Sequence, residues 1–265
     1  HLIQQTYFCK KLIMKYVFIL LLVTCNVMAQ TMNTKVIAHR GAWKEFNLPQ
    51  NSIAALKKSI EVKCFGTEFD VHLTKDNIVV VNHDHDFYGF NIETTNYSDL
   101  LIKKHANGEK LPTLNDFYLV GLQQNDTKLI LEVKTSAIGG THRTKKLIDV
   151  IVKELPHNAD PKNLEFILFD FDSAVYLKNK LPDFFVHYLE GDKTAAQIQE
   201  SGLNGMDYNY HLLLADKNIL TEFKNSNLKT NSWTVNDLEI AKEFMAQGID
   251  CITTDYPQLF LENGL

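Results

Sequence analysis

The sequence predicts an α/β fold, a (β/α)8 or TIM barrel with a small insertion after the second strand. Short apolar, β-rich runs alternate with longer segments of helical period from residue 35 onward, which is typical of a parallel sheet. There are eight such units in roughly 230 residues, and that number suits a closed barrel better than an open doubly wound sheet. The turn after the first strand, HRGAWKEF, has one glycine and so lacks a glycine-rich phosphate loop. The open sheet is the alternative.

The expected strands are β-branched and aromatic runs bounded by polar turns. In chain order they cover residues 36–40, 65–71, 128–134, 166–169, 184–188, 205–208, 229–234 and 250–254. The segments between them predict helices over residues 52–62, 141–154, 173–180, 194–201, 216–225 and 237–247. Suitable N-caps stand at several of their starts: Asn51 or Ser52, Thr141, Asp172 or Ser173, and Asn236 or Asp237. Gly202 and Gly248 stand where helices are expected to end.

One segment breaks this alternation. Residues 85–113 are longer than a normal connection between a strand and a helix, and they are rich in Asn, Tyr, His and Lys. Loops of this length inside a compact domain are usually functional or disordered. We expect this segment to be an insertion that lies over the functional site.

The N-terminal segment differs in kind from the rest. The basic stretch KKLIMKY is followed by the apolar run VFILLLV and then by CNVMAQ, a pattern typical of a secretory signal peptide over residues 1–29. An uncleaved anchor and lipid attachment at Cys25 are the alternatives. The sequence therefore predicts an exported protein, periplasmic or secreted, in which residues 30–265 form a single catalytic barrel domain.

Composition excludes some classes of partner. The net charge is −5 and the lysines are scattered singly, so there is no basic stripe of the kind that binds nucleic acid. We expect a small-molecule partner, and contact with a membrane only through the signal segment or a lipid substrate. The cysteines of the predicted mature chain, Cys64 and Cys251, lie in or beside expected strands, which favours two buried free thiols; a disulfide between them, as in an exported protein, is the alternative.

Two carboxylates on the second strand are the first sign of a functional site. Glu68 and Asp70 are two positions apart, so on a strand they face the same side, while Phe69 and Val71 face the other. Glu132 lies near the end of the third strand. Buried acids need a positive partner, and a divalent cation is the simplest one.

The ends of the first three strands would bring these acids together with two positively charged side chains. The first strand ends in His39 and Arg40, and the third ends in Lys134. Functional residues of a barrel gather at the carboxyl ends of its strands, and consecutive strands are neighbours. Carboxylates without a sulfur ligand suit one hard divalent cation, Ca²⁺ first and Mg²⁺ second, with zinc ranked lower. The alternative is that the acids only form ion pairs with Arg40 and Lys134.

Two histidines favour a catalytic interpretation. His39 and His83 both follow apolar runs and stand beside a charged residue, Arg40 or Asp84. Imidazole titrates near neutrality, which suits proton transfer. Five further histidines of the expected barrel lack such company and are predicted to be structural or on the surface: His72, His85, His142, His187 and His211.

Six motifs carry a resemblance to a known family. HRGAWKEFNLPQNSIAAL, GTEFDVHLTKDNIVVVNHD, LPTL, LEVK, WTVN and TTDYP occur in this order. Together they resemble the glycerophosphodiester phosphodiesterases, from about residue 36 to residue 257. The resemblance implies a (β/α)8 barrel with a small insertion after strand two. It also implies hydrolysis of glycerophosphodiesters to glycerol 3-phosphate and an alcohol.

The resemblance also implies roles for individual residues. The two histidines above would be the general acid and base, and the three carboxylates above would bind Ca²⁺ or Mg²⁺. Arg40 and Lys134 would hold the phosphate. Trp233, at the end of the seventh strand, would line the pocket, with a place in the core as the alternative. The family usually has PEN where this chain has Pro49, Gln50 and Asn51, which places an amide where a carboxylate is common.

Two other functions stay open at this point. A phospholipase acting on intact lipid would need an apolar rim, which Phe87, Tyr88 and Phe90 could form. A phosphodiester-binding protein with impaired catalysis is suggested by Gln50. The sequence does not indicate the oligomeric state, the alcohol that is released, or which histidine is the acid.

Overall fold

The computed structural model describes residues 34–157 and 159–265, so the predicted signal peptide and Cys25 lie outside the described residues. Residues Thr34–Leu265 form one compact unit. Within that unit, no described helix is both long and apolar enough to cross a membrane.

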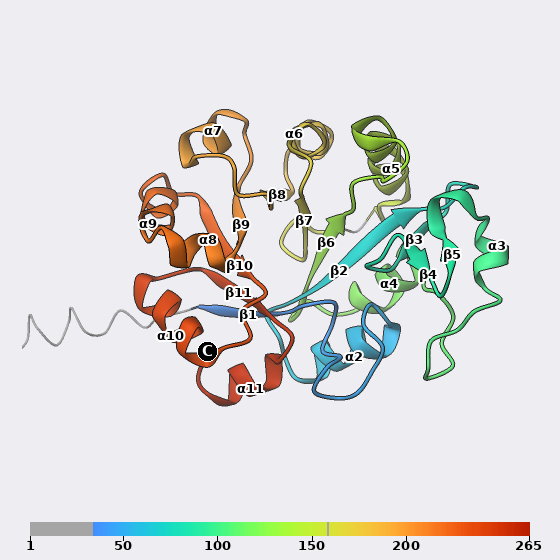
Figure 1. The fold of residues 1–265 in the computed structure, drawn as a ribbon, viewed down its shortest axis with the longest axis horizontal. Helices are drawn as coiled ribbons and strands as arrows, with labels where there is room; N and C mark the ends of the chain where they lie inside the picture. Colours follow the sequence, from blue (N-terminus) through green and yellow to red (C-terminus); the bar gives the residue numbers. More distant parts are fainter. Residues whose placement is uncertain (1–33, 158) are drawn as a thin grey trace, which may run out of the picture. The chain divides into compact units, whose positions relative to one another are not determined.

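The centre of the structure is a closed barrel of parallel strands (Figure 1). They are β1 (Lys35–Ala38), β2 (Gly66–Leu73), β6 (Lys128–Val133), β7 (Leu164–Leu168), β8 (Phe185–Tyr188), β9 (Gly205–Asn209), β10 (Lys229–Trp233) and β11 (Cys251–Thr254). Each pairs with the next in chain order, and β1 pairs with both β2 and β11, which closes the ring. The predicted barrel is confirmed, and every predicted strand end lies within two residues of the observed one.

Helices surround the barrel. They are α2 (Ile53–Glu61), α4 (Leu114–Gly121), α5 (Gly140–Glu154), α6 (Phe171–Lys180), α7 (Ala195–Glu200), α8 (Tyr210–Ala215), α9 (Asn218–Asn225), α10 (Leu238–Gln247) and α11 (Pro257–Glu262). The six predicted helices are confirmed. The predictions did not include α4, α8 and α11, which are short, although Thr113 and Asp116 form a capping box at the start of α4.

The predicted helix ends are partly right. Ser52 and Asp237 cap α2 and α10 as expected, and Gly248 ends α10 at a φ of 79°. The predicted cap at Thr141 is wrong, because α5 begins one residue earlier and its N-cap is Gly139. The prediction for α6 is also wrong: the helix begins at Phe171 with Asp170 as N-cap, and Ser173 lies inside it, where its hydroxyl donates to Asp170.

The two faces of β2 differ as its sequence predicts. Phe69 and Val71 are fully buried in the main core between the barrel and its helices, where Phe69 packs against Phe117 at 4.6 Å between ring centroids. Burial of one such side chain contributes about 1.5–3 kcal/mol. The alternating pattern therefore leaves Glu68 and Asp70 facing the barrel interior.

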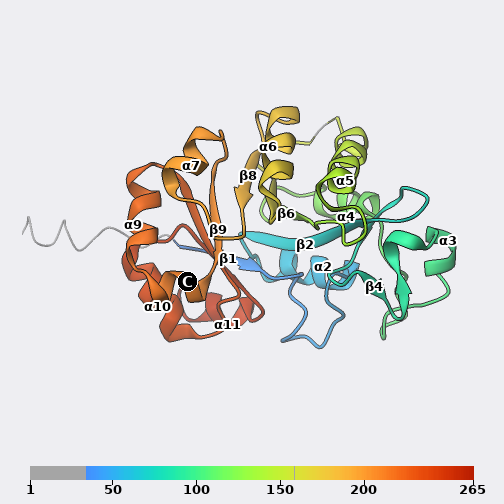
Figure 2. The ribbon, with the colours of Figure 1, turned by 45° about the horizontal axis from the view of Figure 1, so that its top comes forward.

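The insertion after β2 has its own small core. It comprises β3 (Val79–Val81), β4 (Asp86–Phe87), β5 (Phe90–Asn91), the 3-10 helix η1 (Ile92–Thr94) and α3 (Tyr97–Leu100). Val80, Phe87, Ile92, Leu100 and Leu111 form a hydrophobic cluster separate from the main core. Figures 1 and 2 both show this insertion beyond the end of β2, on the side opposite to α9 and α10. The predicted insertion after strand two is therefore present.

The apolar rim suggested for the insertion is largely absent. Phe87 is buried in the insertion's own core, and Phe90 is half-buried against it. Only Tyr88 of the three aromatic residues is exposed. The two phenylalanines stabilise the insertion and are not free to form a lipid-binding surface.

A polar layer lies inside the barrel on β7 to β10. Glu165 Oε2 lies 3.5 Å from His187 Nε2. Asp207 is 2% exposed, and its Oδ1 has no hydrogen-bond partner among the described residues. Asn231, on the next strand, donates to Thr253 at 2.8 Å. Burial raises the pKa of Asp207 to about 7, and the neighbouring His187 and Asn231 only partly oppose this rise.

Asp207 predicts a pH dependence of stability. The folded protein keeps this proton between about pH 4 and pH 7, where the unfolded chain has lost it, so the free energy of unfolding is expected to fall as pH rises through that window. Asp207→Asn removes this loss. The free energy of unfolding of the variant should therefore exceed that of the wild type by on the order of 1–4 kcal/mol as pH rises through this window. Urea unfolding of both proteins from pH 4 to pH 8 measures the difference. A difference that does not change with pH would contradict the assignment to Asp207.

Candidate active site

Three carboxylates meet at the carboxyl ends of β2 and β6. The strand register places Asp70 of β2 beside Glu132 of β6, and Glu68 faces the same side of β2. One oxygen from each carboxylate lies within 4.8 Å of the others. All three residues are buried, with at most 8% of their surface exposed. The structure therefore brings together the acids that the sequence singled out on two strands.

Nearby donors satisfy only part of this acidic cluster. The main-chain N–H of Arg40 donates to Glu68 Oε2 at 2.8 Å, and Asn51 Nδ2 donates to Asp70 Oδ2 at 2.8 Å. Lys134 Nζ lies 3.3 Å from Asp70 Oδ1 and 2.7 Å from Glu132 Oε1. Glu68 Oε1 is buried without a hydrogen-bond partner among the described residues. An unpartnered buried carboxylate oxygen indicates that a further positive group belongs here.

The carboxylates affect one another's protonation. Burial raises the pKa of Glu132 to about 8, and the charge of Asp70 adds to the rise. Burial likewise raises the pKa of Glu68, with contributions from the other two acids. Burial tends to raise the pKa of Asp70 as well. Lys134, His83 and Arg40 outweigh this effect, so the pKa of Asp70 is lowered to about 2. Three acids with one adjacent ammonium and an unpartnered oxygen fit a hard divalent cation.

Arg40 is held from two sides. Its Nη1 donates to Gln50 Oε1 at 2.8 Å, and its Nε lies 3.8 Å from Asp70 Oδ2. Its backbone is left-handed, with a φ of 56°. Gly41 follows with a φ of 83°, and a Cβ there would lie 2.7 Å from the Cβ of Ala55. The first strand therefore ends in a tight turn that requires glycine and aims the Arg40 N–H at Glu68.

His39 is paired with an acid that the sequence analysis did not single out. His39 Nδ1 lies 2.7 Å from Asp255 Oδ1, just beyond β11. Asn236 Nδ2 donates to Asp255 Oδ2 at 2.9 Å, and Lys44 Nζ lies 3.3 Å from the same oxygen. Burial acts upward on the pKa of Asp255, but His39, Asn236 and Lys44 lower it to about 2. The carboxylate fixes the proton on Nδ1 and leaves Nε2 of His39 free to exchange a proton.

His83 lies at the entrance to the insertion. Its Nδ1 lies 2.8 Å from Asp84 Oδ1, and its carbonyl oxygen is 3.1 Å from His72 Nε2. Burial lowers the pKa of His83, and the positive charges of Lys134 and Arg40 add to that effect, whereas Asp70 opposes it. The main-chain N–H of the preceding residue, Asn82, donates to the carbonyl oxygen of Asp70 at 3.0 Å, which keeps His83 close to the acidic cluster. An imidazole with a lowered pKa is largely unprotonated at neutral pH and can accept a proton.

Trp233 and Lys134 lie in surroundings that match the alternatives given for them in the sequence analysis. Trp233 is half-buried inside the barrel, where its Nε1 donates to the Asp207 carbonyl at 2.9 Å and its ring meets Phe169 edge-on at 5.6 Å. Lys134 bridges two carboxylates in this structure. Asn51 and Asp255 were missed as functional residues, although both lie within the quoted motifs. For Asp255 the signal is an acid placed directly after the β-rich run CITT.

Comparison with known proteins agrees with this arrangement. The model of the glycerophosphoryl diester phosphodiesterase family matches residues 39–259. A glycerophosphodiester phosphodiesterase from Caldanaerobacter subterraneus subsp. tengcongensis is 30% identical over 260 residues, which cover 87% of this chain and 97% of that protein.

Solved structures are similar over nearly the same span. A glycerophosphodiester phosphodiesterase from Parabacteroides distasonis has a TM-score of 0.83 at 35% identity, covering 87% of this chain and 96% of that one. A phosphodiesterase from Oleispira antarctica, solved with the product sn-glycerol-3-phosphate, has a TM-score of 0.72 at 22% identity, covering 88% and 97%. The second likeness is one of fold.

Proposed function

Since the chain belongs to the glycerophosphoryl diester phosphodiesterase family, we propose that it hydrolyses glycerophosphodiesters to glycerol 3-phosphate and an alcohol. The observation that carries the proposal is the buried cluster of Glu68, Asp70 and Glu132 beside Arg40 at the carboxyl ends of β1, β2 and β6. An anionic diester needs positive charge at the site of attack. The carboxylates of this cluster can hold the cation that supplies that charge.

The proposed cofactor is one divalent cation, Ca²⁺ first and Mg²⁺ second. Glu68, Asp70 and Glu132 would hold it through oxygen atoms, the ligands that both ions prefer. When bound, the ion supplies positive charge that offsets the negative charge developing on the phosphoryl oxygens. Arg40 binds a phosphate oxygen through the guanidinium nitrogens that Gln50 does not occupy. Lys134 contributes a second, shared positive charge from its place between the acids.

The two histidines provide the proposed proton transfers. One takes a proton from the nucleophile, which is water or the neighbouring glycerol hydroxyl, and the other gives a proton to the departing alcohol oxygen. His39 is suited to this by the Asp255 carboxylate, which lies 2.7 Å from its Nδ1 and orients the ring. His83 has Asp84 in the equivalent position, at 2.8 Å. Proton transfer of this kind needs both residues to keep one ring nitrogen free.

Release of glycerol 3-phosphate from glycerophosphocholine and related soluble esters tests the function. Hydrolysis of intact phospholipid in vesicles, assayed in parallel, tests the phospholipase alternative. The burial of Phe87 leaves little apolar surface for vesicle binding, so we expect the soluble esters to be the better substrates. Tight binding of the ester without turnover, with Ca²⁺, Mg²⁺ or Mn²⁺ present, would instead favour a binding protein.

Export is part of the proposal. It is supported by the basic and apolar stretch KKLIMKYVFILLLV ahead of the barrel. In a periplasmic or secreted enzyme, the substrates would be glycerophosphodiesters met outside the cytoplasm.

Gln50 is expected to act through Arg40. Gln50→Leu removes the acceptor at 2.8 Å from Arg40 Nη1 and leaves a partly buried N–H unsatisfied, a loss of about 0.5–1.5 kcal/mol. We therefore expect KM to rise about 2–10-fold, with a smaller change in kcat. Gln50→Glu, which places the family's usual residue here, keeps an acceptor and should stay within about 3-fold of the wild type. Steady-state kinetics of both variants check this, and a Gln50→Leu enzyme with an unchanged KM would exclude the role.

A further inference from the structure

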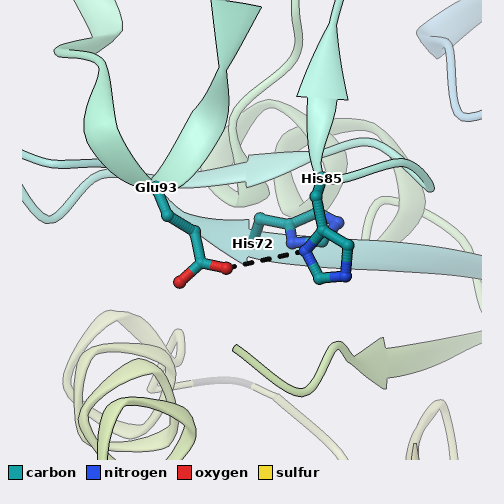
Figure 3. A group of neighbouring side chains, drawn as sticks. All are labelled: His72, His85 and Glu93. Carbon is teal, nitrogen blue, oxygen red and sulfur yellow. Dashed lines mark ion pairs between the residues drawn. The ribbon is translucent and has the colours of Figure 1, made fainter. Parts of the chain in front are cut away.

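We propose a second metal site, formed by His72, His85 and Glu93, which binds a transition-metal cation such as Zn²⁺. It lies where the insertion meets the barrel (Figure 3), and it shares no residue with the three-carboxylate cluster. The proposal does not depend on the reaction that the enzyme catalyses.

The three side chains converge from different elements. His72 comes from the end of β2, His85 from the loop before β4, and Glu93 from η1. One ligand atom from each lies within 4.8 Å of the others. His85 Nδ1 lies 3.5 Å from Glu93 Oε1, and the two imidazole rings meet edge-on with centroids 5.0 Å apart. Figure 3 shows the Glu93 carboxylate pointing toward His85, with His72 beside it.

The hydrogen bonds of His72 leave a lone pair for a metal. Its Nε2 lies 3.1 Å from the carbonyl oxygen of His83, which can only accept, so the ring proton is on Nε2. The lone pair is therefore on Nδ1, which has no hydrogen-bond partner among the described residues. A ligand histidine that donates its other ring proton to a backbone carbonyl is the usual arrangement in metal sites. His85 also lacks a hydrogen-bond partner for its ring within the described part of the chain.

Glu93 is held in place from its other sides. The Ala137 N–H donates to Oε1 at 2.9 Å, Arg143 Nε donates to Oε2 at 3.1 Å, and the Ser136 hydroxyl also donates to Oε2. The residue is 4% exposed. These donors orient the carboxylate and leave Oε1 a second lone pair on the side of His85.

The ligand set selects the kind of cation. Arg143 already offsets the charge of Glu93, so the two imidazoles must supply most of the affinity. Imidazole suits zinc and its neighbours, whereas Ca²⁺ and Mg²⁺ need oxygen ligands. Two histidines and one glutamate, with water as fourth ligand, form a known tetrahedral zinc set. The His85 side chain is 44% exposed, which gives an ion a path from solvent.

The test measures zinc bound by the full chain in the presence of excess Ca²⁺, which is intended to occupy the carboxylate cluster. Equilibrium dialysis with Zn²⁺ is followed by elemental analysis of the protein. His85→Ala should lower zinc affinity at this site by about 100-fold or more. Loss of a residue that only hydrogen-bonds a metal ligand already costs about 10–100-fold, and His85 is a ligand itself. His142→Ala, a change of an exposed histidine on α5, is the matched control and should bind as the wild type does.

Thermal unfolding provides a second measurement. Zinc should raise the Tm of the wild type and of His142→Ala, but not that of His85→Ala, because an ion that binds the folded site and not the unfolded chain stabilises the folded protein. Equal zinc binding by His85→Ala and wild type, or no zinc binding by the wild type, would overturn the proposal. Neither measurement uses hydrolysis, so its outcome is separate from that of the proposed function.

Discussion

His83→Ala is expected to lower kcat for glycerophosphodiester hydrolysis by about 10²–10⁴-fold, the usual contribution of a general acid or base. Alanine removes the imidazole whose Nδ1 is paired with Asp84 and leaves the three carboxylates in place. Cation affinity should therefore change far less than kcat. Steady-state release of glycerol 3-phosphate measures the effect, and calorimetric titration with Ca²⁺ measures the affinity.

His142→Ala again serves as the control and should keep wild-type activity, since that residue is exposed on α5. His39→Ala should match the loss seen with His83→Ala, because the reaction needs a proton removed at one end and delivered at the other. A kcat within about 3-fold of the wild type for either catalytic variant would exclude that histidine from proton transfer.

Removal of the divalent cation is expected to reduce hydrolysis to the background rate. Without it, Glu68 and Glu132 face Asp70 in a buried cluster with one ammonium for three acids. Burial raises the pKa of Glu132 to about 8, so at pH 7 the metal-free protein keeps a proton that the cation must displace. Cation affinity should therefore increase as pH rises toward 8, and binding at pH 7 should release protons.

Two measurements check this prediction. Activity after dialysis against a chelator, with and without added Ca²⁺ or Mg²⁺, gives the dependence on the cation. Calorimetric titration in two buffers of different ionisation enthalpy gives the number of protons released. Glu132→Gln should bind the cation more weakly and release fewer protons than the wild type. Full activity both in chelator and in Glu132→Gln would contradict the role of the acidic cluster.

Much of the fold could be predicted because each strand of the barrel has a recognisable local sequence pattern. Each strand is an apolar run between polar turns, and the alternation on β2 separates Phe69 from Glu68 and Asp70. Helix starts were less predictable. Thr141 is a good N-capping residue, yet Gly139 takes that position, because the turn that carries Ser136 back to Gly140 sets where α5 begins.

The part of the candidate site that lies on one strand or on the ends of neighbouring strands was predictable. Neighbouring strand ends bring Glu132 to Asp70, and strand period alone pairs Asp70 with Glu68. The support of His39 was not predictable, because Asp255 lies 216 residues away in the sequence and meets it only when β11 closes on β1. The cluster of His72, His85 and Glu93 was missed for a similar reason, since the fold of the insertion decides which of its side chains return to β2.

The separate core of the insertion makes it exchangeable. Val80, Phe87 and Leu111 pack with one another in a cluster separate from the main core of the barrel, whereas Val79 and Val81 of β3 belong to that core. A homologous segment with a different tip after β3 could therefore replace this one without repacking the strands below. Arg143 sets the boundary of such an exchange, because it binds the carbonyls of Leu73 and Thr74 as well as Glu93. A lineage, or an engineer, that keeps this junction can therefore vary the tip of the insertion while the strands that carry the acidic cluster stay unchanged.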